Sequence, residues 1–172
     1  EEMITSGTNI PDELGDDDIY YNKVSGSTNT RGLRDFHNLF VKKLLVTKVS
    51  NRGDTLIDLA VGKGGDISKW IYAKLKFVFG IDISRDNIQN RLDGACARYL
   101  NYRKKFKVMP KALFVNGNSS VNIRNTEGIL NEKDKQITRA VFGYGAKDIK
   151  ELGKGVYNQY GVGEKGFNIT SI

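Results

Sequence analysis

The most informative segment of this chain is the glycine-rich run Asp58-Leu59-Ala60-Val61-Gly62-Lys63-Gly64-Gly65-Asp66. It joins an apolar run over residues 55–59, which predicts a buried parallel strand, to a helical pattern that starts at Asp66. Glycines in such a turn let the backbone bend sharply and approach a ligand without Cβ clashes. A second apolar run ends in Asp82, and an acid at the tip of the second strand suits the ribose hydroxyls of an adenosine. This order of features predicts a Rossmann-like α/β fold, with a mostly parallel sheet flanked by helices, that binds an adenosyl cofactor.

Charge is distributed unevenly along the chain. The 172 residues include 27 Lys and Arg and 20 Asp and Glu. Positions 1–30 hold one basic and seven acidic side chains, so the other 142 residues carry 26 basic and 13 acidic side chains, a net charge of +13. A basic body attracts polyanions through phosphate neutralisation. Lysine-rich surfaces are common in soluble proteins, but beside an adenosyl-cofactor motif this charge favours an RNA or DNA substrate.

Other residue types restrict the class of protein. Cys96 is the only cysteine and His37 the only histidine, so we expect no internal disulfide and no structural zinc site. A single cysteine fits a reducing, intracellular setting, with Cys96 as a small buried side chain. No apolar stretch approaches the roughly 20 residues of a membrane helix, and the acidic N-terminus is unlike a signal peptide. We therefore expect a soluble protein without metal or membrane contacts.

The spacing of apolar residues predicts the order of elements. Residues 1–30 are expected to form a flexible acidic arm, followed by one cofactor-binding domain over 31–172. Helices are expected over 33–49, 66–76, 84–105, 133–142 and 147–152, and strands over 55–59, 77–82, 111–115 and 167–172, with a polar loop at 116–120 and a glycine-rich excursion at 153–166. A doubly wound domain that ends on its fourth strand lacks half of its sheet, so we expect an incomplete domain.

Two enzyme classes share a glycine-rich turn with a distal acid: nicotinamide-dependent dehydrogenases and adenosylmethionine-dependent methyltransferases. In the dehydrogenases a pyrophosphate rests on the helix N-terminus, where Asp66 would repel it in this chain. A cationic cofactor without phosphates suits an acid at that position. The residues therefore favour S-adenosylmethionine.

Several motifs, in one order, resemble the messenger-RNA cap guanine-N7 methyltransferases, most closely those of the capping enzymes of large DNA viruses. The resemblance covers roughly residues 31–172 and identifies them as a methyltransferase domain. Its carriers are Arg34-Asp35-Phe36-His37-Asn38, Gly62-Lys63-Gly64-Gly65-Asp66 with Lys69-Trp70, Asp82-Ile83, Arg98-Tyr99 and Asn118-Ser119-Ser120. The Gly-Lys-Gly-Gly-Asp motif is much more specific than a lone Gly-x-Gly.

The resemblance implies S-adenosylmethionine as cofactor, S-adenosylhomocysteine as product and capped RNA as substrate. The implied cofactor-binding residues are Lys42, Ala60, Gly62, Asp66, Asp82, Asn118 and Ser119. The residues implied to face the cap guanosine and its triphosphate are His37, Asn38, Lys63, Lys69 and Arg98. Because guanine N7 already carries a free lone pair, we expect in-line methyl transfer that needs no catalytic acid or base.

The chain departs from the family pattern in four places. Val41 occupies the ungapped position of a family lysine, so Lys42 takes that role only with a one-residue slip, and Lys43 is the alternative. Ala60 replaces a glycine, and Asn118 replaces an Asp, which predicts weaker cofactor binding. The chain ends at Ile172, before the family's Gln-Phe-x-x-His-Tyr segment, so we expect most of the guanine pocket to be absent.

Alternatives stay open at this point. Asp66 can act as a helix N-cap, Lys63, Lys69 and Arg98 as solvated side chains, and His37 as a structural hydrogen-bonding group. The protein can be a methyltransferase of DNA or protein, or a non-catalytic module that holds the cofactor or RNA. An incomplete sheet also exposes an apolar edge through which a homodimer can form. The resemblance implies a viral factory or virion if the chain is viral, and the nucleus otherwise.

Overall fold

The computed structural model describes residues 30–142. Predictions for the acidic arm, the helix over 147–152, the glycine-rich excursion and the fourth strand lie outside the described residues. The elements, in chain order, are α1 (Arg31–Asp35), the π-helical turn η1 (Phe36–Val41), α2 (Lys42–Val49), β1 (Thr55–Asp58), α3 (Ile67–Tyr72), β2 (Phe77–Asp82), α4 (Arg85–Gln89), α5 (Ala95–Lys105), β3 (Lys111–Asn116), the 3-10 helix η2 (Ile123–Asn125) and α6 (Glu132–Val141).

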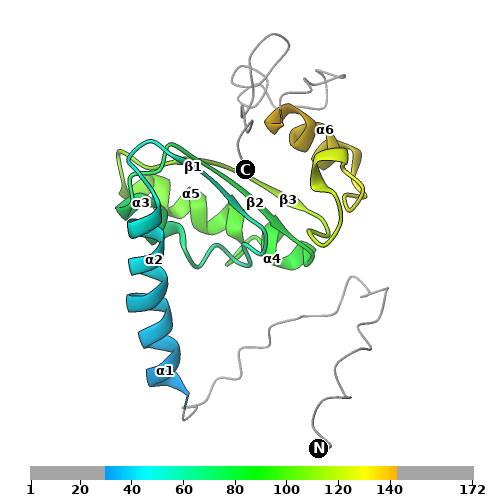
Figure 1. Cartoon of the computed structure of the whole chain (residues 1–172). Helices are drawn as coiled ribbons and strands as arrows, with labels where there is room; N and C mark the ends of the chain where they lie inside the picture. The colour runs from blue at the N-terminus through cyan, green and yellow to red at the C-terminus, as the bar shows by residue number, and fades with distance from the viewer. Residues whose placement is uncertain (1–29, 143–172) are drawn as a thin grey trace, which may run out of the picture.

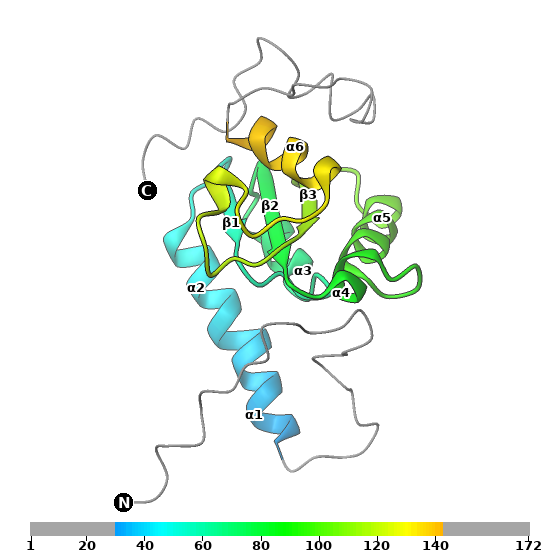
Figure 2. The same ribbon diagram turned by 90° about the vertical axis from the view of Figure 1, so that its right-hand side faces the viewer.

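The strands form a parallel sheet in the order β1-β2-β3. Thr55 lies opposite Phe77 in the first pair, and Phe77 lies opposite Lys111 in the second. The sheet lies between α6 on one side and α3, α4 and α5 on the other (Figures 1 and 2). The expected Rossmann-like arrangement of a parallel sheet flanked by helices is therefore confirmed.

The central strand β2 is buried along its whole length and supplies both cores. Its alternate side chains Phe77, Phe79 and Ile81 pack toward α6, because successive side chains of a strand point to opposite faces. On the other face, the core of buried residues consists of Val61, Ile67, Trp70, Leu75, Val78, Ile88 and Ala95. The apolar spacing correctly predicted Trp70 and Ile88 as core residues.

The first helix runs without a break from Arg31 to Val49 and projects from the sheet, meeting α3 through α2 (Figure 1). None of its described side chains is buried. The rings of Phe36 and Phe40 stack on each other at a centroid distance of 5.5 Å, and both remain more than half exposed. Over residues 30–142, no helix is long and apolar enough to cross a membrane.

The single helix expected over residues 84–105 is wrong, because the structure has two helices, α4 and α5, separated by a turn. The side-chain oxygen of Asn90 accepts hydrogen bonds from the backbone N–H groups of Leu92 and Asp93, at 3.0 and 3.3 Å. This turn shifts the helical phase, so Ala95 is fully buried whereas Leu92 and Cys96 are exposed. The expected burial of Cys96 is therefore also wrong.

The turn between α4 and α5 depends on a glycine for steric reasons. A Cβ on Gly94 would lie 2.7 Å from both the backbone N and O of Asn90. We expect Gly94→Ala to lower the free energy of unfolding by about 1–3 kcal/mol, as overpacking does. The control is Gly32→Ala, where a Cβ meets nothing within 4 Å and a helical alanine should stabilise by about 0.5–1 kcal/mol. Urea unfolding measures both, and an unchanged midpoint for Gly94→Ala would contradict this packing.

Candidate functional site

The three strands end in polar side chains at one edge of the sheet. β1 ends at Asp58, β2 at Asp82 and β3 at Asn116, and the last two lie opposite each other in register. The side-chain amide of Asn116 donates hydrogen bonds to the backbone oxygens of Asp82 and Ile83, at 3.0 and 2.8 Å. Ligands of open α/β sheets bind outside this carboxyl edge. The edge is therefore the candidate site.

The glycine turn is fastened onto this edge. The backbone N–H of Gly62 donates to Asp82 Oδ2 at 2.7 Å, and that of Val61 donates to the Ile81 oxygen at 3.1 Å. Gly62 and Gly64 have φ values of +54° and +72°, which side chains rarely adopt. A Cβ on Gly62 would meet nothing within 4 Å, so its requirement for glycine is conformational. The open space beside Gly62 leaves its backbone accessible to a ligand.

Asp82 is a buried carboxylate, 8% exposed, with protein partners on both oxygens. Oδ2 accepts the Gly62 hydrogen bond, and Oδ1 accepts from Ser84 N at 2.9 Å and Asn87 Nδ2 at 3.1 Å. An ionised carboxylate has about four lone-pair sites. Three are therefore used, and one remains for a ligand hydroxyl.

Asp66 forms an ion-pair cluster with two lysines. Its Oδ2 lies 3.2 Å from Lys42 Nζ and its Oδ1 lies 2.5 Å from Lys69 Nζ. Burial alone would raise the pKa of Asp66, but hydrogen bonds and charge from Lys69, then from Lys42, bring its net pKa below the ordinary value. Asp66 precedes α3 but makes no side-chain capping hydrogen bond. The ion pairs therefore replace the capping role that the sequence left open.

The π-helical turn η1 explains why Lys42, and not Val41, reaches Asp66. The backbone N–H of Lys42 bonds to the oxygen of His37, five residues earlier. A π-helical turn holds one residue more than an α-helical turn, so it accommodates the one-residue slip that separates the lysine from the Phe36-His37-Asn38 motif. Lys43 points elsewhere, with its Nζ 4.1 Å from the centre of the Tyr72 ring. The geometry thus favours Lys42 over Lys43 at this position.

Asp58 belongs to the site, although the sequence analysis placed it only in the motif. Burial is the largest cause of the raised pKa of Asp58. The hydrogen bond that Asp58 Oδ1 accepts from the Ala60 N–H, at 3.2 Å, lowers this pKa, and the negative charges of Asp66 and Asp82 raise it. Lys42 opposes these charges. Asp66 and Asp82 therefore both lie within electrostatic reach of Asp58. The signal in the sequence was the position of Asp58 at the end of the first strand.

Lys63 and Arg98 are placed differently from the other expected site residues. Lys63 Nζ lies 2.9 Å from Asp93 Oδ1 and 3.2 Å from Asp86 Oδ2, which fixes the glycine turn to α4 and to the loop before α5. The hydrogen bond to Asp93 is the first cause of the raised pKa of Lys63. No hydrogen bond or ion pair joins the Arg98 side chain to the described residues of the glycine turn. These contacts favour a structural role for Lys63.

The loop after β3 closes the edge beside the glycine turn. Ser119 Oγ donates to the Leu59 oxygen at 2.7 Å, which ties two loops 60 residues apart. Asn118 Oδ1 accepts from Ser120 N at 2.9 Å, and Asn118 N donates to the Gly128 oxygen at 2.8 Å. Both expected adenine-binding residues therefore lie beside the glycine turn, and one lone pair of the Asn118 amide oxygen is already used.

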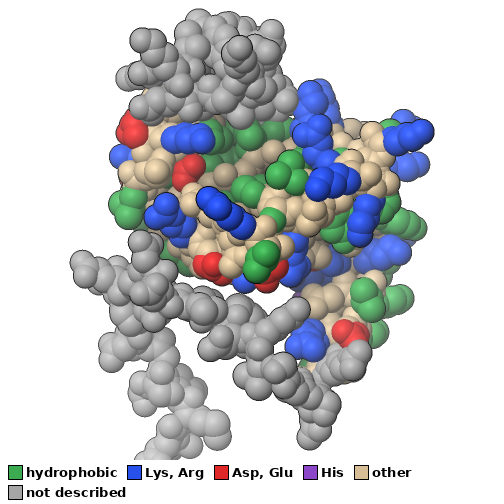
Figure 3. Space-filling view, turned by 180° about the vertical axis from the view of Figure 1, so that it is seen from behind, with side chains coloured by type: hydrophobic (Ala, Val, Ile, Leu, Met, Phe, Trp, Pro, Cys, Tyr) green, Lys and Arg blue, Asp and Glu red, His purple; other side chains and the backbone are tan. Residues whose placement is uncertain are grey.

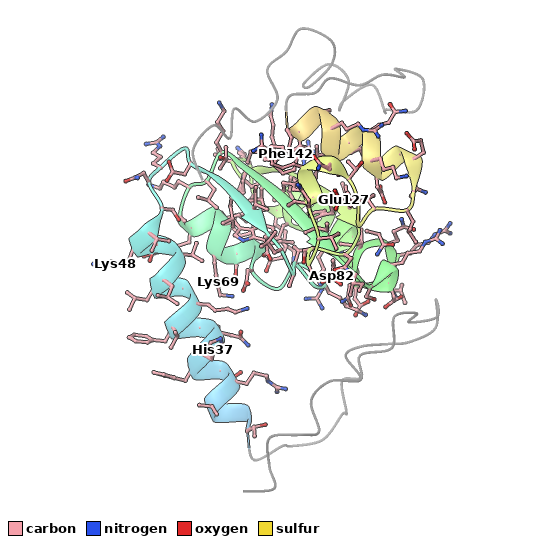
Figure 4. All side chains as sticks on the ribbon, turned by 45° about the vertical axis from the view of Figure 1, so that its right-hand side comes forward. His37, Lys48, Lys69, Asp82, Glu127 and Phe142 are labelled. Atoms are coloured by element: carbon pink, nitrogen blue, oxygen red, sulfur yellow. The ribbon has the colours of Figure 1, made fainter. Side chains whose placement is uncertain are left out.

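The remaining expected residues lie along the first helix and α3. His37 is exposed on the projecting helix, and Lys69 lies where that helix meets α3 (Figure 4). Asn38 and Lys69 line one cavity of about 400 Å³. The structure therefore brings Asn38 and Lys69 together and leaves His37 apart from Asp82. Within residues 30–142, no cluster of three His, Cys, Asp or Glu side chains could hold a metal ion.

The amino-acid sequence of this chain is similar to those of known proteins. The family model described as "mRNA (guanine-N(7))-methyltransferase domain" matches residues 20–140. A probable mRNA-capping enzyme of Acanthamoeba polyphaga mimivirus is 33% identical over 100 residues, which are 58% of this chain and 8% of that protein. The mRNA cap guanine-N(7) methyltransferase 1 of Oryza sativa is 40% identical over 53 residues, 31% of this chain and 14% of that protein. The Saccharomyces cerevisiae mRNA cap guanine-N(7) methyltransferase is 42% identical over 57 residues, 33% and 13% of the two chains.

These matched segments span less than a sixth of each relative. The family match itself covers residues 20–140, so it includes the three strands and the glycine turn described above. The parallel sheet, the glycine turn on its carboxyl edge and the family match agree. The chain belongs to the family of mRNA (guanine-N7)-methyltransferase domains.

Proposed function

We propose that this chain binds S-adenosylmethionine and contributes that site to methylation of the guanine N7 of capped RNA. The observation that carries the proposal is the charge arrangement at the carboxyl edge of the sheet. Three carboxylates, of Asp58, Asp66 and Asp82, surround the glycine turn, and Lys42 and Lys69 oppose them. Such a site suits a ligand that carries both positive groups and a carboxylate, and it disfavours a pyrophosphate.

The methionine part of the cofactor fits the charges around the glycine turn. The ammonium and sulfonium groups are positive, so they are favoured beside Asp66 and Asp58, whereas the cofactor carboxylate is favoured beside the half-exposed ammonium of Lys42. Backbone groups of Ala60 and Gly62 lie where they can line this part of the ligand. Asp66 is ionised at neutral pH, and its lowered pKa extends the ionised state further into acid.

The adenosine part fits the loops that follow β2 and β3. The one free lone-pair site of Asp82 can accept one ribose hydroxyl, fewer than the two that a free carboxylate could accept. Asn118 and Ser119 are the proposed adenine neighbours. Because the Asn118 side chain bonds within its own loop and the Ser119 side chain bonds to the Leu59 oxygen, both are held in place for contact with the base.

When bound, S-adenosylmethionine would supply an electrophilic methyl group for transfer from its sulfur to guanine N7, while the chain supplies position and charge. No proton moves, so catalysis by this domain is orientation of the reacting groups. Asn38, Lys69, His37 and Arg98 are the proposed cap neighbours, and Lys63 joins them only if its ion pairs with Asp93 and Asp86 open.

The surface charge is suited to an RNA substrate. Lys and Arg side chains are spread over the face seen from behind, with Asp and Glu more sparsely placed (Figure 3).

Titration calorimetry with S-adenosylmethionine, beside a methylation assay on capped and uncapped RNA, tests the function. Binding with turnover that a cap analogue inhibits supports cap methylation, whereas binding without turnover supports a cofactor-holding module. Absence of cofactor binding would overturn the proposal.

The role of Lys42 gives a quantitative prediction. We expect Lys42→Met to weaken S-adenosylmethionine binding roughly 10- to 150-fold, because a hydrogen bond to a charged group is worth about 1.5–3 kcal/mol. Lys48→Met, the same change at an exposed position of α2, is the matched control and should leave the affinity unchanged. Calorimetry measures both. Equal affinities for Lys42→Met and the parent chain would exclude Lys42 from the cofactor site.

The shifted pKa values of Asp58 and Asp66 predict opposite effects of pH on the free energy of unfolding. The raised pKa of Asp58 means that the folded protein holds its proton more tightly than the unfolded chain, so Asp58 lowers stability as pH rises above about 4. We expect Asp58→Asn, which keeps an oxygen for the Ala60 N–H, to be more stable than the parent at pH 7.

Asp66→Asn should behave in the opposite way. The lowered pKa of Asp66 contributes stability above about pH 4, and this stability is lost as pH falls through the folded-state pKa. The variant should therefore be less stable than the parent at pH 7, and both differences should shrink in acid. Urea unfolding from pH 3 to 7 measures them, and shifts of the same sign for the two variants would contradict the assignments.

A further inference from the structure

We propose that the groove between the first helix and α3 is a binding site for single-stranded RNA, which holds the first nucleotides that follow the cap. This inference rests on the proposed function and extends it to a surface outside the proposed cofactor site. The groove is a cavity of about 400 Å³ lined by Asn38, Leu39, Lys43, Ser68, Lys69 and Tyr72. Two of these, Lys43 and Tyr72, have no part in the cofactor site.

Two adjacent lysines of the first helix contact the two ends of α3. Lys42 and Lys43 differ by about 100° around the helix axis, since a turn holds 3.6 residues. Lys42 meets Asp66 at the start of α3, and Lys43 lies over Tyr72 at its end. Asp66 and Tyr72 are six residues apart, which corresponds to about 9 Å along the axis of α3. At roughly 3.4 Å or more per nucleotide, the groove accommodates one or two nucleotides beside the proposed site.

The chemistry of the groove matches a nucleotide. The Tyr72 ring is 61% exposed, and its contact with the Lys43 ammonium, at 4.1 Å, holds an aromatic face and a positive charge together. An aromatic ring for base stacking beside a cation for the phosphate is the usual way in which single-stranded RNA is bound without sequence preference. Asn38 and Ser68 add polar groups that can meet ribose hydroxyls.

Lys43 is the cation that the groove can offer to a phosphate. Lys69 is nearly buried, and its ammonium is neutralised by Asp66 at 2.5 Å. Lys43, by contrast, forms no ion pair with an acid among residues 30–142. The phosphate attraction of the groove therefore depends on one lysine, which makes the proposal testable by a single substitution.

Basic residues continue beyond the Tyr72 end of the groove. The loop over 50–54 and the segment that follows α3 are joined by hydrogen bonds from Gly53 N to the Lys74 oxygen and from Lys76 N to the Asp54 oxygen, at 3.0 and 2.8 Å. The exposed side chains of Arg52, Lys74 and Lys76 lie on these two segments. Lys74 and Lys76 follow Tyr72 by two and four residues, so they add positive charge near the Tyr72 end of the groove, which favours RNA over a single free nucleotide.

Fluorescence anisotropy with the whole 172-residue chain tests the proposal. The probes are a cap dinucleotide and a capped RNA of six nucleotides, both titrated in the presence of S-adenosylmethionine. We expect Tyr72→Ala to weaken binding of the capped six-mer about tenfold, the usual loss for one stacked base, and Tyr72→Phe to restore it. Lys43→Ala should reduce the slope of log affinity against log salt by about 0.7, the value for one phosphate contact on a single strand.

The matched control is Lys107→Ala, an exposed lysine beyond the end of α5, which should change neither affinity nor salt slope. Both Tyr72 and Lys43 are exposed, so thermal unfolding should verify that the variants remain folded. Unchanged binding of the six-mer by Tyr72→Ala would overturn the groove proposal while leaving cap binding intact. Equal competition by a poly-glutamate peptide would overturn it in favour of an acidic protein partner. Failure of the parent chain to bind S-adenosylmethionine would instead refute the proposed function.

Discussion

The hydrogen bond from the Gly62 N–H to the buried carboxylate of Asp82 is the contact on which the site depends. It joins the turn after β1 to the end of β2, and the same carboxylate holds the start of α4 through Ser84 and Asn87. A buried carboxylate is stable only when its oxygens are satisfied, and here backbone and amide N–H groups satisfy them. One side chain thus fixes the spacing of the two strand ends that any ligand at this edge must bridge.

Charge balance is the second constraint, because the edge concentrates acids that repel one another. Asp66 is stabilised by two lysines from different elements, α2 and α3, so the ion-pair cluster also anchors the projecting helix to the body of the domain. Burying Lys69 would be costly without its partner, since an unpaired buried charge is strongly destabilising. Burial is the first cause of the raised pKa of Asp58; the negative charges of Asp66 and Asp82 add to it, and Lys42 opposes them. A cationic ligand beside Asp58 would relieve that repulsion.

The sequence predicted the elements correctly where the spacing of apolar residues agrees with the turn residues that bound each run. The strand over 77–82 is found with its predicted bounds, and α6 lies within one residue of its prediction. The break at Asn90 was missed because an Asn side chain that bonds to its own backbone has no signature in apolar spacing. For the site, residue types identified Asp66 and Asp82. The ion pairs of Lys63 join segments 20 to 30 residues apart, and the raised pKa of Asp58 depends first on its burial in the folded protein, so neither follows from local sequence.

The π-helical turn η1 keeps a lysine beside Asp66, although Val41 occupies the ungapped position of the family lysine. An α-helix through Val41 would have presented an apolar side chain where the ion pair with Asp66 requires a cation. Because the turn from His37 to Lys42 takes one extra residue, α2 keeps its packing on α3 while the segment before it is rotated. The same rotation sets Asn38 and Lys43, five residues apart, on the wall of one groove. A single inserted residue therefore determines both which lysine meets Asp66 and which residues line the groove beside it.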